Sequence, residues 1–183
     1  MSDLARLSAA LHASERTLRR AAHSGLIRAD RLSERRLRVP DAERRYLTGH
    51  WPVLSGLRAA LRTEPNVRLA ILFGSTARGD DGPNSDVDVL VDQRRSGRFR
   101  TLELEDRLSR SIGRPVEVVQ LSDAERDRGL MSEVITDGRV LADRDDVWPR
   151  LSADKHVIRE EAEHAFAIQA AKALRRARRA VSG

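Results

Sequence analysis

The stretch LAILFGSTARGDDGPNSDVDVLVD, residues 69–92, decides the fold. It opens on an apolar run with the length and composition of a fully buried strand, and it breaks at Gly74-Ser75. A short helix is predicted over residues 76–78 with Ser75 as its N-cap, so that backbone amides of the turn face an anion such as a phosphate. Gly74 would let that phosphate approach the backbone with no Cβ in the way.

Two aspartates follow this turn, and ten residues separate Ser75 from the first of them, Asp86. Side chains on a strand point to alternate faces, so Asp86 and Asp88 are predicted to lie on one side and the intervening valines on the other. Two like charges this close raise each other's pKa unless a cation lies between them, and Mg²⁺ prefers such oxygen ligands. A phosphate-binding turn beside metal-binding aspartates indicates nucleotidyl transfer, in which metal ions align a triphosphate.

The pattern Gly74-Ser75, ten residues, Asp86-x-Asp88 resembles the signature of minimal nucleotidyltransferases, the MNT branch of the DNA polymerase β-like nucleotidyltransferases. The match extends over the motifs GSTARG and SDVDVLV. The resemblance implies an α+β polymerase β-like nucleotidyltransferase fold, a small mixed sheet with helices on one face. It also implies two Mg²⁺ ions held by Asp86 and Asp88. The substrate would be ATP or another NTP, whose β and γ phosphates contact Gly74 and Ser75.

Two further residues complete the predicted site. A third strand is predicted at residues 116–121, where the family usually has the aspartate of an Arg-Pro-Val-Asp motif and this chain has Glu117. The resemblance implies that Glu117 contacts the metal nearer the attacking hydroxyl; an edge-strand acid on the solvent side is the alternative. Arg78 would reach a triphosphate oxygen, or it would pair with Asp80 or Asp81 as part of the scaffold.

Length and composition limit the classes of protein to which this chain can belong. A chain of 183 residues holds one ordinary domain or two small ones, and the absence of cysteine excludes disulfides and thiolate metal sites. The net charge of +6 favours acidic partners such as nucleic acid, although a GC-rich genome also enriches arginine and alanine. The sequence has no apolar run of membrane-helix length and no signal-peptide core. We expect a cytoplasmic protein with no membrane partner.

Residues 1–50 are predicted to form a small helical module. Ser14 is placed to cap a helix in SERTLRRAAHSG that Gly25 would end, and a hairpin at residues 31–39 would form a wing. The stretch resembles the winged helix-turn-helix of bacterial regulators, whose second helix enters the major groove. The residues that this resemblance places against operator DNA are Arg16, Thr17, Arg19 and Arg20. A packing module, or an adaptor for a protein partner, is the alternative.

The domain boundary is predicted near residue 50. A helix over residues 41–48 would end at a joint formed by residues 49–52, and a second, amphipathic helix would begin at Pro52. Residues 51–146 would then form the nucleotidyltransferase domain, because the family has a helix before its first strand.

The elements beyond the boundary alternate between strands and helices. Strands are predicted at residues 67–73, 86–92, 116–121 and 139–142. One capped helix is predicted over residues 122–137. Residues 147–183 are predicted as a basic C-terminal helix, alanine-rich over roughly 152–180.

The predicted reaction is attack of an acceptor hydroxyl on the α-phosphorus of a bound NTP, with release of pyrophosphate. Because the resemblance implies membership of toxin–antitoxin pairs, the favoured hypothesis is an MNT antitoxin that transfers AMP from ATP to a tyrosine of its partner toxin, a ribonuclease. One alternative is a nucleotidyltransferase toxin that modifies the 3′ end of tRNA. Another is a DNA-binding autorepressor whose nucleotidyltransferase fold senses nucleotide. The histidines show no metal-ligand spacing and receive no role.

Overall fold

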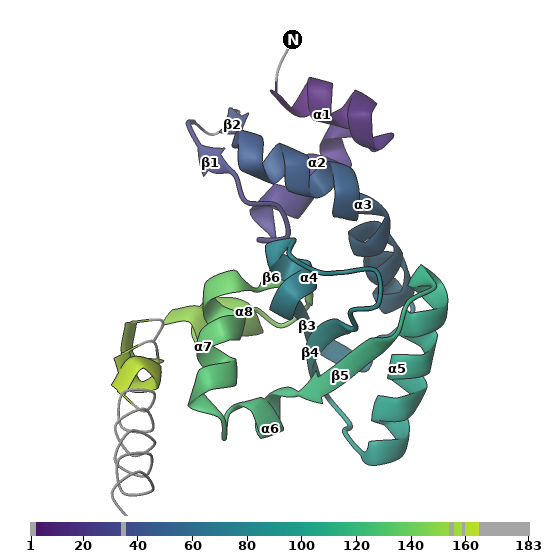
Figure 1. Ribbon diagram of the computed structural model, residues 1–183, viewed down its shortest axis with the longest axis vertical. Coiled ribbons are helices and arrows are strands. Elements are labelled where there is room, and N and C mark those ends of the chain that lie inside the picture. Colours follow the sequence, from purple (N-terminus) through teal and green to yellow (C-terminus); the bar gives the residue numbers. More distant parts are fainter. Residues whose placement is uncertain (1–2, 34–35, 154–155, 159, 165–183) are drawn as a thin grey trace, which may run out of the picture.

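The computed structural model describes residues 3–33, 36–153, 156–158 and 160–164. Figure 1 shows the N-terminal helices gathered at one end of the molecule, and a sheet flanked by helices below them. In chain order the elements are α1 (Asp3–Leu11), α2 (Glu15–His23), β1 (Asp30–Arg31), β2 (Leu37–Arg38), α3 (Asp41–Arg62), β3 (Val67–Phe73), α4 (Gly74–Arg78), β4 (Val87–Gln93), α5 (Arg98–Ile112), β5 (Val116–Gln120), α6 (Leu121–Ala124), α7 (Arg128–Asp137), β6 (Arg139–Asp143) and α8 (Val147–Ala153).

The main sheet has four strands in the order β5-β4-β3-β6. Strand β3 is antiparallel to both of its neighbours, and β4 is parallel to β5. A parallel pair needs a crossover connection, which α5 supplies. Each of the four predicted strands is present with ends within one residue of the prediction, because each is an apolar run bounded by turn residues. The mixed sheet and the α+β class are therefore confirmed.

Helices cover both faces of this sheet, whereas the prediction placed them on one. Helices α3 and α5 pack on the face that carries Leu72 and Val89. Helix α7 packs Met131 and Val134 against the opposite face, at Ile71. The alternation of β3 side chains explains this arrangement, since all but Arg68 of its seven residues are buried and a strand with two apolar faces needs a cover on each.

The N-terminal module contains two short helices followed by a small hairpin. The Ser14 hydroxyl accepts a hydrogen bond from the Thr17 amide at 3.1 Å, so the predicted N-cap of α2 is confirmed. Strands β1 and β2 pair antiparallel where the wing was predicted. Leu18 and Leu26 are fully buried and belong to the same core as the sheet. The module is therefore packed against the rest of the chain.

Helix α3 is continuous, so the predicted joint at residues 49–52 is wrong. Pro52 lies inside the helix and supplies no amide to the carbonyl of Thr48. Thr48 is exposed, so water can reach this carbonyl. Leu47, Trp51 and Leu54 are buried at helical spacing on either side of the proline, and their burial holds the helix together across it. The domain boundary near residue 50, which α3 crosses, stays a prediction.

Two predictions in the C-terminal half need correction or lie outside the described residues. The single helix predicted over residues 122–137 is two helices, α6 and α7, because Asp127 starts a new one by accepting hydrogen bonds from the amides of Gly129 and Leu130. Helix α8 is described as far as Ala153, and residues 156–158 and 160–164 are also helical, but most of the predicted long basic helix lies outside the described residues. Within the described part of the chain, no helix combines the length and apolar character needed to cross a bilayer.

A buried ion pair joins the N-terminal module to the sheet. Arg139, 1% exposed at the start of β6, contacts both carboxylate oxygens of Glu43 on α3 at 2.6 and 3.0 Å. Its guanidinium also donates to the carbonyls of Ala77 at 2.8 Å and Leu26 at 3.2 Å, and lies 3.6 Å from the ring centroid of Tyr46. Four segments distant in sequence therefore meet at one side chain.

Removal of either charge of this pair is expected to destabilise the protein strongly. Glu43→Ala or Arg139→Ala leaves a buried charge without its partner, so we expect the free energy of unfolding to fall by about 3–5 kcal/mol. Urea denaturation followed by circular dichroism measures this change. The control is Arg110→Ala, which breaks an exposed pair with Asp106 on α5 and should cost under about 0.5 kcal/mol. Equal, small losses in all three variants would contradict the role given to the pair.

Candidate active site

The Gly-Ser turn lies at the end of the central strand and against the second aspartate. Gly74 begins α4 with a φ of +70°, and a Cβ built there would overlap Asp88 Oδ2. The predicted cap is wrong, because Phe73 occupies the N-cap position and Ser75 lies inside the helix. Glycine is therefore required at position 74 both by its backbone conformation and by the closeness of Asp88.

Sheet register brings the predicted carboxylates to one place. Asp88 is opposite Phe73 on β3 and beside Glu117 on the parallel strand β5. Asp86 lies immediately before β4. Asp88 is half-buried, whereas Asp86 and Glu117 are exposed. Asp86 and Glu117 thus lie near Asp88, which is the acid in contact with the Gly-Ser turn.

Negative charge is concentrated around Asp88. Burial, together with the nearby charges of Glu117, Glu133 and Asp86, raises the pKa of Asp88 to about 6. Glu133 belongs to α7, which packs on this face of the sheet. Sequence reasoning missed Glu133, because its nearness depends on how α7 crosses the sheet, and no motif marks it. An excess of like charge is the condition that a bound cation relieves.

Arg78, the arginine of the GSTARG motif, supplies positive charge near these acids. Its guanidinium pairs with Glu133 and with Asp80, at 3.3 Å from Nε to Oδ2 in the second case. Asp137 lies 3.9 Å away. The hydrogen bond to Glu133 raises the pKa of Arg78. The predicted scaffold pairing with Asp80 is therefore present, and the phosphate contact of Arg78 stays a prediction.

The loop between the Gly-Ser turn and Asp86 is tied to the scaffold through Asp81. His50 Nε2 lies 2.8 Å from one oxygen of this carboxylate, and Arg114 Nη1 lies 2.9 Å from the other. Burial raises the pKa of Asp81, but the hydrogen bonds from His50 and Arg114 outweigh it and the pKa is lowered. Arg114 also donates to the carbonyl of Ser85 at 2.9 Å, directly before Asp86.

His50 and Tyr46 support this loop from α3, a role that sequence reasoning did not give to any histidine. Their rings stack with centroids 4.4 Å apart, and the Tyr46 hydroxyl donates to the carbonyl of Thr76 at 3.1 Å. The other ring nitrogen of His50 lies 3.0 Å from the Tyr46 carbonyl. Because Tyr46 and Asp81 both offer acceptors, both contacts are hydrogen bonds only when both ring nitrogens carry a proton.

The acids of this site fit a divalent cation by their chemistry. They are oxygen donors with an excess of negative charge, and Asp88 lies against the Gly74 backbone. Within residues 3–33, 36–153, 156–158 and 160–164, no three acidic or histidine side chains converge as a metal-binding group. Two of the three predicted ligands, Asp86 and Glu117, are exposed, and a rotamer change would be needed to complete a binding set.

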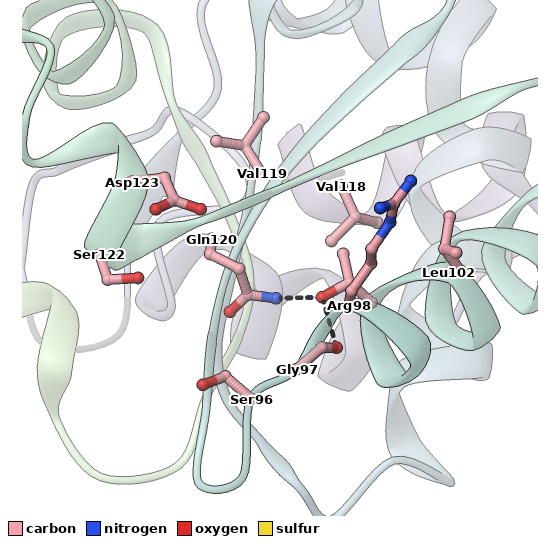
Figure 2. A pocket seen from close by; sticks show the side chains of 10 residues that line it. Ser96, Gly97, Arg98, Leu102, Val118, Val119, Gln120, Ser122 and Asp123 are labelled. Atoms are coloured by element: carbon pink, nitrogen blue, oxygen red, sulfur yellow. Dashed lines mark hydrogen bonds between the residues drawn. The ribbon is translucent and has the colours of Figure 1, made fainter.

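A cavity of about 490 Å³ lies beside the site, between the start of α5 and the end of β5. Figure 2 shows Arg98 and Leu102 on one side and Val118, Val119 and Gln120 on the other. The cavity begins one residue beyond Glu117 along β5. None of the predicted site residues lines it.

The predicted DNA-contacting residues belong to another part of the molecule. Arg16, Thr17, Arg19 and Arg20 lie on α2, in the N-terminal module, and are not brought to the carboxylates. Arg16, Thr17 and Arg20 are exposed and Arg19 is partly buried. Their contact with DNA stays a prediction.

Comparison with known proteins places this site in context. A family model described as polymerase beta nucleotidyltransferase matches residues 56–147, which is half of the chain. No curated protein matches.

Two solved structures show the same fold. A toxin–antitoxin complex with AMP-PNP is 24% identical at a TM-score of 0.53, covering 65% of this chain and 98% of its own. A mutant of the toxin–antitoxin complex MntA–HpeT is 22% identical, with the same TM-score and the same coverage.

Substitution of Gly74 tests the contact between the turn and Asp88. In Gly74→Ala the methyl group would overlap Asp88 and hold alanine at positive φ, so we expect the free energy of unfolding to fall by about 2 kcal/mol or more. The matched control is Gly82→Ala in the adjoining loop, where the nearest atom to a new Cβ is Ser85 Oγ at 3.7 Å. It should change stability by less than about 0.5 kcal/mol. Equal stability of the two variants would contradict this packing.

Replacement of Asp88 by asparagine should stabilise the metal-free protein at alkaline pH. The pKa of Asp88 is about 6 in the fold, above its usual 3.8, so its contribution favours folding below about pH 4 and is lost as the pH rises through 6. Asp88→Asn removes the crowded charge. Because Asp88 is only half-buried, we expect the free energy of unfolding to rise by about 1 kcal/mol near pH 8 and to stay unchanged near pH 4. Thermal unfolding in chelator at both pH values measures it, with the exposed Asp123→Asn as a control.

Proposed function

The chain belongs to the polymerase beta nucleotidyltransferase family, and we propose that it transfers AMP from ATP to a hydroxyl group of a partner toxin, as the antitoxin of a toxin–antitoxin pair. The observation that carries the proposal is the register of the sheet. It sets Asp88 against the Gly74 turn, with Glu117 beside it on the parallel strand. This arrangement supports a triphosphate bound at the turn with its reacting phosphorus near the carboxylates.

The chemistry proposed for this site is a single displacement. The acceptor oxygen forms a bond to the α-phosphorus, and the bond from that phosphorus to the bridging oxygen breaks, releasing pyrophosphate. The proton of the acceptor hydroxyl passes to Glu117, which is exposed and adjacent to Asp88. Gly74 and Ser75 hold the β and γ phosphates through the backbone of the turn, and Arg78 neutralises part of their charge.

Magnesium is part of this proposal, as two ions. Asp86, Asp88 and Glu117 would hold them, and when bound they would supply electrostatic stabilisation of the phosphate oxygens. The crowding that raises the pKa of Asp88 supports a site built for positive charge. Glu133 and Arg78 lie at the edge of this site, and their ion pair keeps both side chains in place.

The solved structures of the same fold are toxin–antitoxin complexes, one of them with AMP-PNP, and each is covered almost entirely by this chain. That supports a protein acceptor and an adenine nucleotide. A tRNA 3′ end is the second candidate, favoured by the net charge of +6. A cytoplasmic location is proposed to accompany either acceptor.

Loss of either aspartate should abolish transfer. We expect Asp86→Asn and Asp88→Asn to reduce incorporation of label from α-labelled ATP by about 10²-fold or more, because each removes charge that stabilises the reacting phosphate. Asp106→Asn, which changes an exposed acid on α5, is the matched control and should retain activity. The assay combines the purified protein, Mg²⁺ and either the candidate toxin or total tRNA.

The two acceptors give different products in this assay. Label on the toxin, with a mass increase of one adenylate, supports the antitoxin. Label on RNA with no protein partner present transfers the assignment to tRNA modification. Undiminished transfer by the Asp86→Asn, Asp88→Asn double variant would overturn the site itself.

A further inference from the structure

A second polar site is formed by residues of α2 and α3, none of which belongs to the carboxylate site. It is a groove of about 280 Å³ between α2 and the second half of α3. We call it the basic groove, and it is lined by Thr17, Arg20, Trp51, Ser55, Arg58 and Arg62. Three of these six residues are arginines and none is acidic, so the groove presents only positive charge.

These residues form one stripe on α2 and another on α3. The four residues from α3 recur after four, three and four positions, which places them on one face of the helix. Thr17 and Arg20 are three apart on α2 and face the same groove. The α3 stripe from Trp51 to Arg62 extends about 16 Å along the helix axis. A strand of duplex nucleic acid carries one phosphate per about 3.4 Å of its axis, so the stripe could run beside about five phosphates.

The charge of the groove has no compensation from the protein. Within the described residues, the guanidinium groups of Arg20, Arg58 and Arg62 take part in none of the ion pairs or hydrogen bonds. By contrast, Arg44, Arg68, Arg78, Arg107 and Arg139 each pair with a carboxylate. Burial and the charge of Arg62 lower the pKa of Arg58. An anion between these two arginines would stabilise the charged form of Arg58.

We propose that the basic groove binds the sugar–phosphate backbone of a nucleic acid, with Arg58 and Arg62 on neighbouring phosphates and Arg20 extending the contact onto α2. Guanidinium and hydroxyl groups are the side chains that most often contact phosphates. A groove for a protein partner would be expected to have an apolar core, and the sole large apolar residue here, Trp51, is 8% exposed. The exposed Arg16 and Arg20 of α2 would lie next to the bound backbone.

This proposal extends beyond the transfer reaction and does not depend on it. It names two arginines of α3 that the helix-turn-helix resemblance does not include, and it makes α3 a backbone-contacting helix next to α2. Duplex DNA and RNA share the chemistry that the groove recognises. The experiment therefore compares the two.

Binding of labelled nucleic acid to the full chain tests the groove. Fluorescence anisotropy with a random-sequence DNA duplex, and separately with an RNA hairpin, is measured between about 50 and 200 mM salt. We expect salt-sensitive binding by the wild-type protein. In Arg58→Gln, Arg62→Gln the affinity should fall about tenfold or more, and the slope of log affinity against log salt should decrease by about two, one for each lost phosphate contact.

Two further variants separate a lost contact from a lost fold or a lost charge. Arg58→Lys, Arg62→Lys keeps both charges and should keep most of the salt dependence. Arg100→Gln, Arg126→Gln removes two exposed arginines from α5 and from the segment after α6, and should change affinity less than about threefold. All variants are first checked for an unchanged melting temperature.

Three results would overturn the proposal. One is the absence of salt-sensitive binding of the wild-type protein to both DNA and RNA. A second is equal affinity of the wild-type protein and the glutamine variant. The third is loss of binding to a partner protein, with nucleic-acid binding unchanged, in the glutamine variant. Stronger binding to the duplex supports a DNA site, stronger binding to the hairpin supports an RNA site, and either supports the groove.

Discussion

The buried pair of Arg139 and Glu43 is the interaction on which the rest of the structure depends. Removing two charges from water is costly, and the cost is offset here because the guanidinium also donates to the carbonyls of Leu26 and Ala77. Those carbonyls belong to the segment after α2 and to α4. The N-terminal module, α3, the turn after the central strand and β6 must all be in place before this arginine is satisfied. The pair therefore links the correct docking of the module to the correct position of the turn.

The continuous helix α3 joins the two halves of the chain. A helix that ended near residue 50 would leave the module and the sheet as separate bodies joined by a linker. Instead, α3 carries Glu43, Tyr46 and His50 in its first half, where they hold the loop that precedes Asp86, and the arginines of the basic groove in its second half. One helix thus supports both sites. A nucleic acid seated on α3 would contact the same element that fixes the loop of the carboxylate site.

The sequence predicts well those features that depend on neighbours along the chain. The four strands, the Ser14 cap and the placement of Asp88 beside the Gly74 turn all follow from apolar runs, turn residues and strand alternation. Pro52 is the instructive failure, because a local rule ends the helix there and the burial of Trp51 and Leu54 overrides it.

Features that depend on long-range packing could not be predicted in the same way. Arg139 looks like an ordinary first residue of a strand, and its partner is distant in the sequence. Glu133 reaches the carboxylates because α7 crosses the second face of the sheet, and His50 reaches Asp81 because α3 does not bend. Each of these contacts is set by the angle at which a helix lies on the sheet. Apolar periodicity gives the buried face of a helix but not its crossing partner.

Charged side chains in this fold are paired in some places and unpaired in others. A fold selected for stability alone would pair its buried and half-buried charges, as it does at Arg139, Asp81 and Arg78. Two places depart from this rule with opposite signs. Around Asp88 the carboxylates outnumber their cations, and in the basic groove the arginines pair with no carboxylate of the described residues. Uncompensated charge costs stability in the free protein, and a ligand of the opposite sign would offset that cost at each place. This cost supports the two proposals made above, cations at the first place and phosphates at the second.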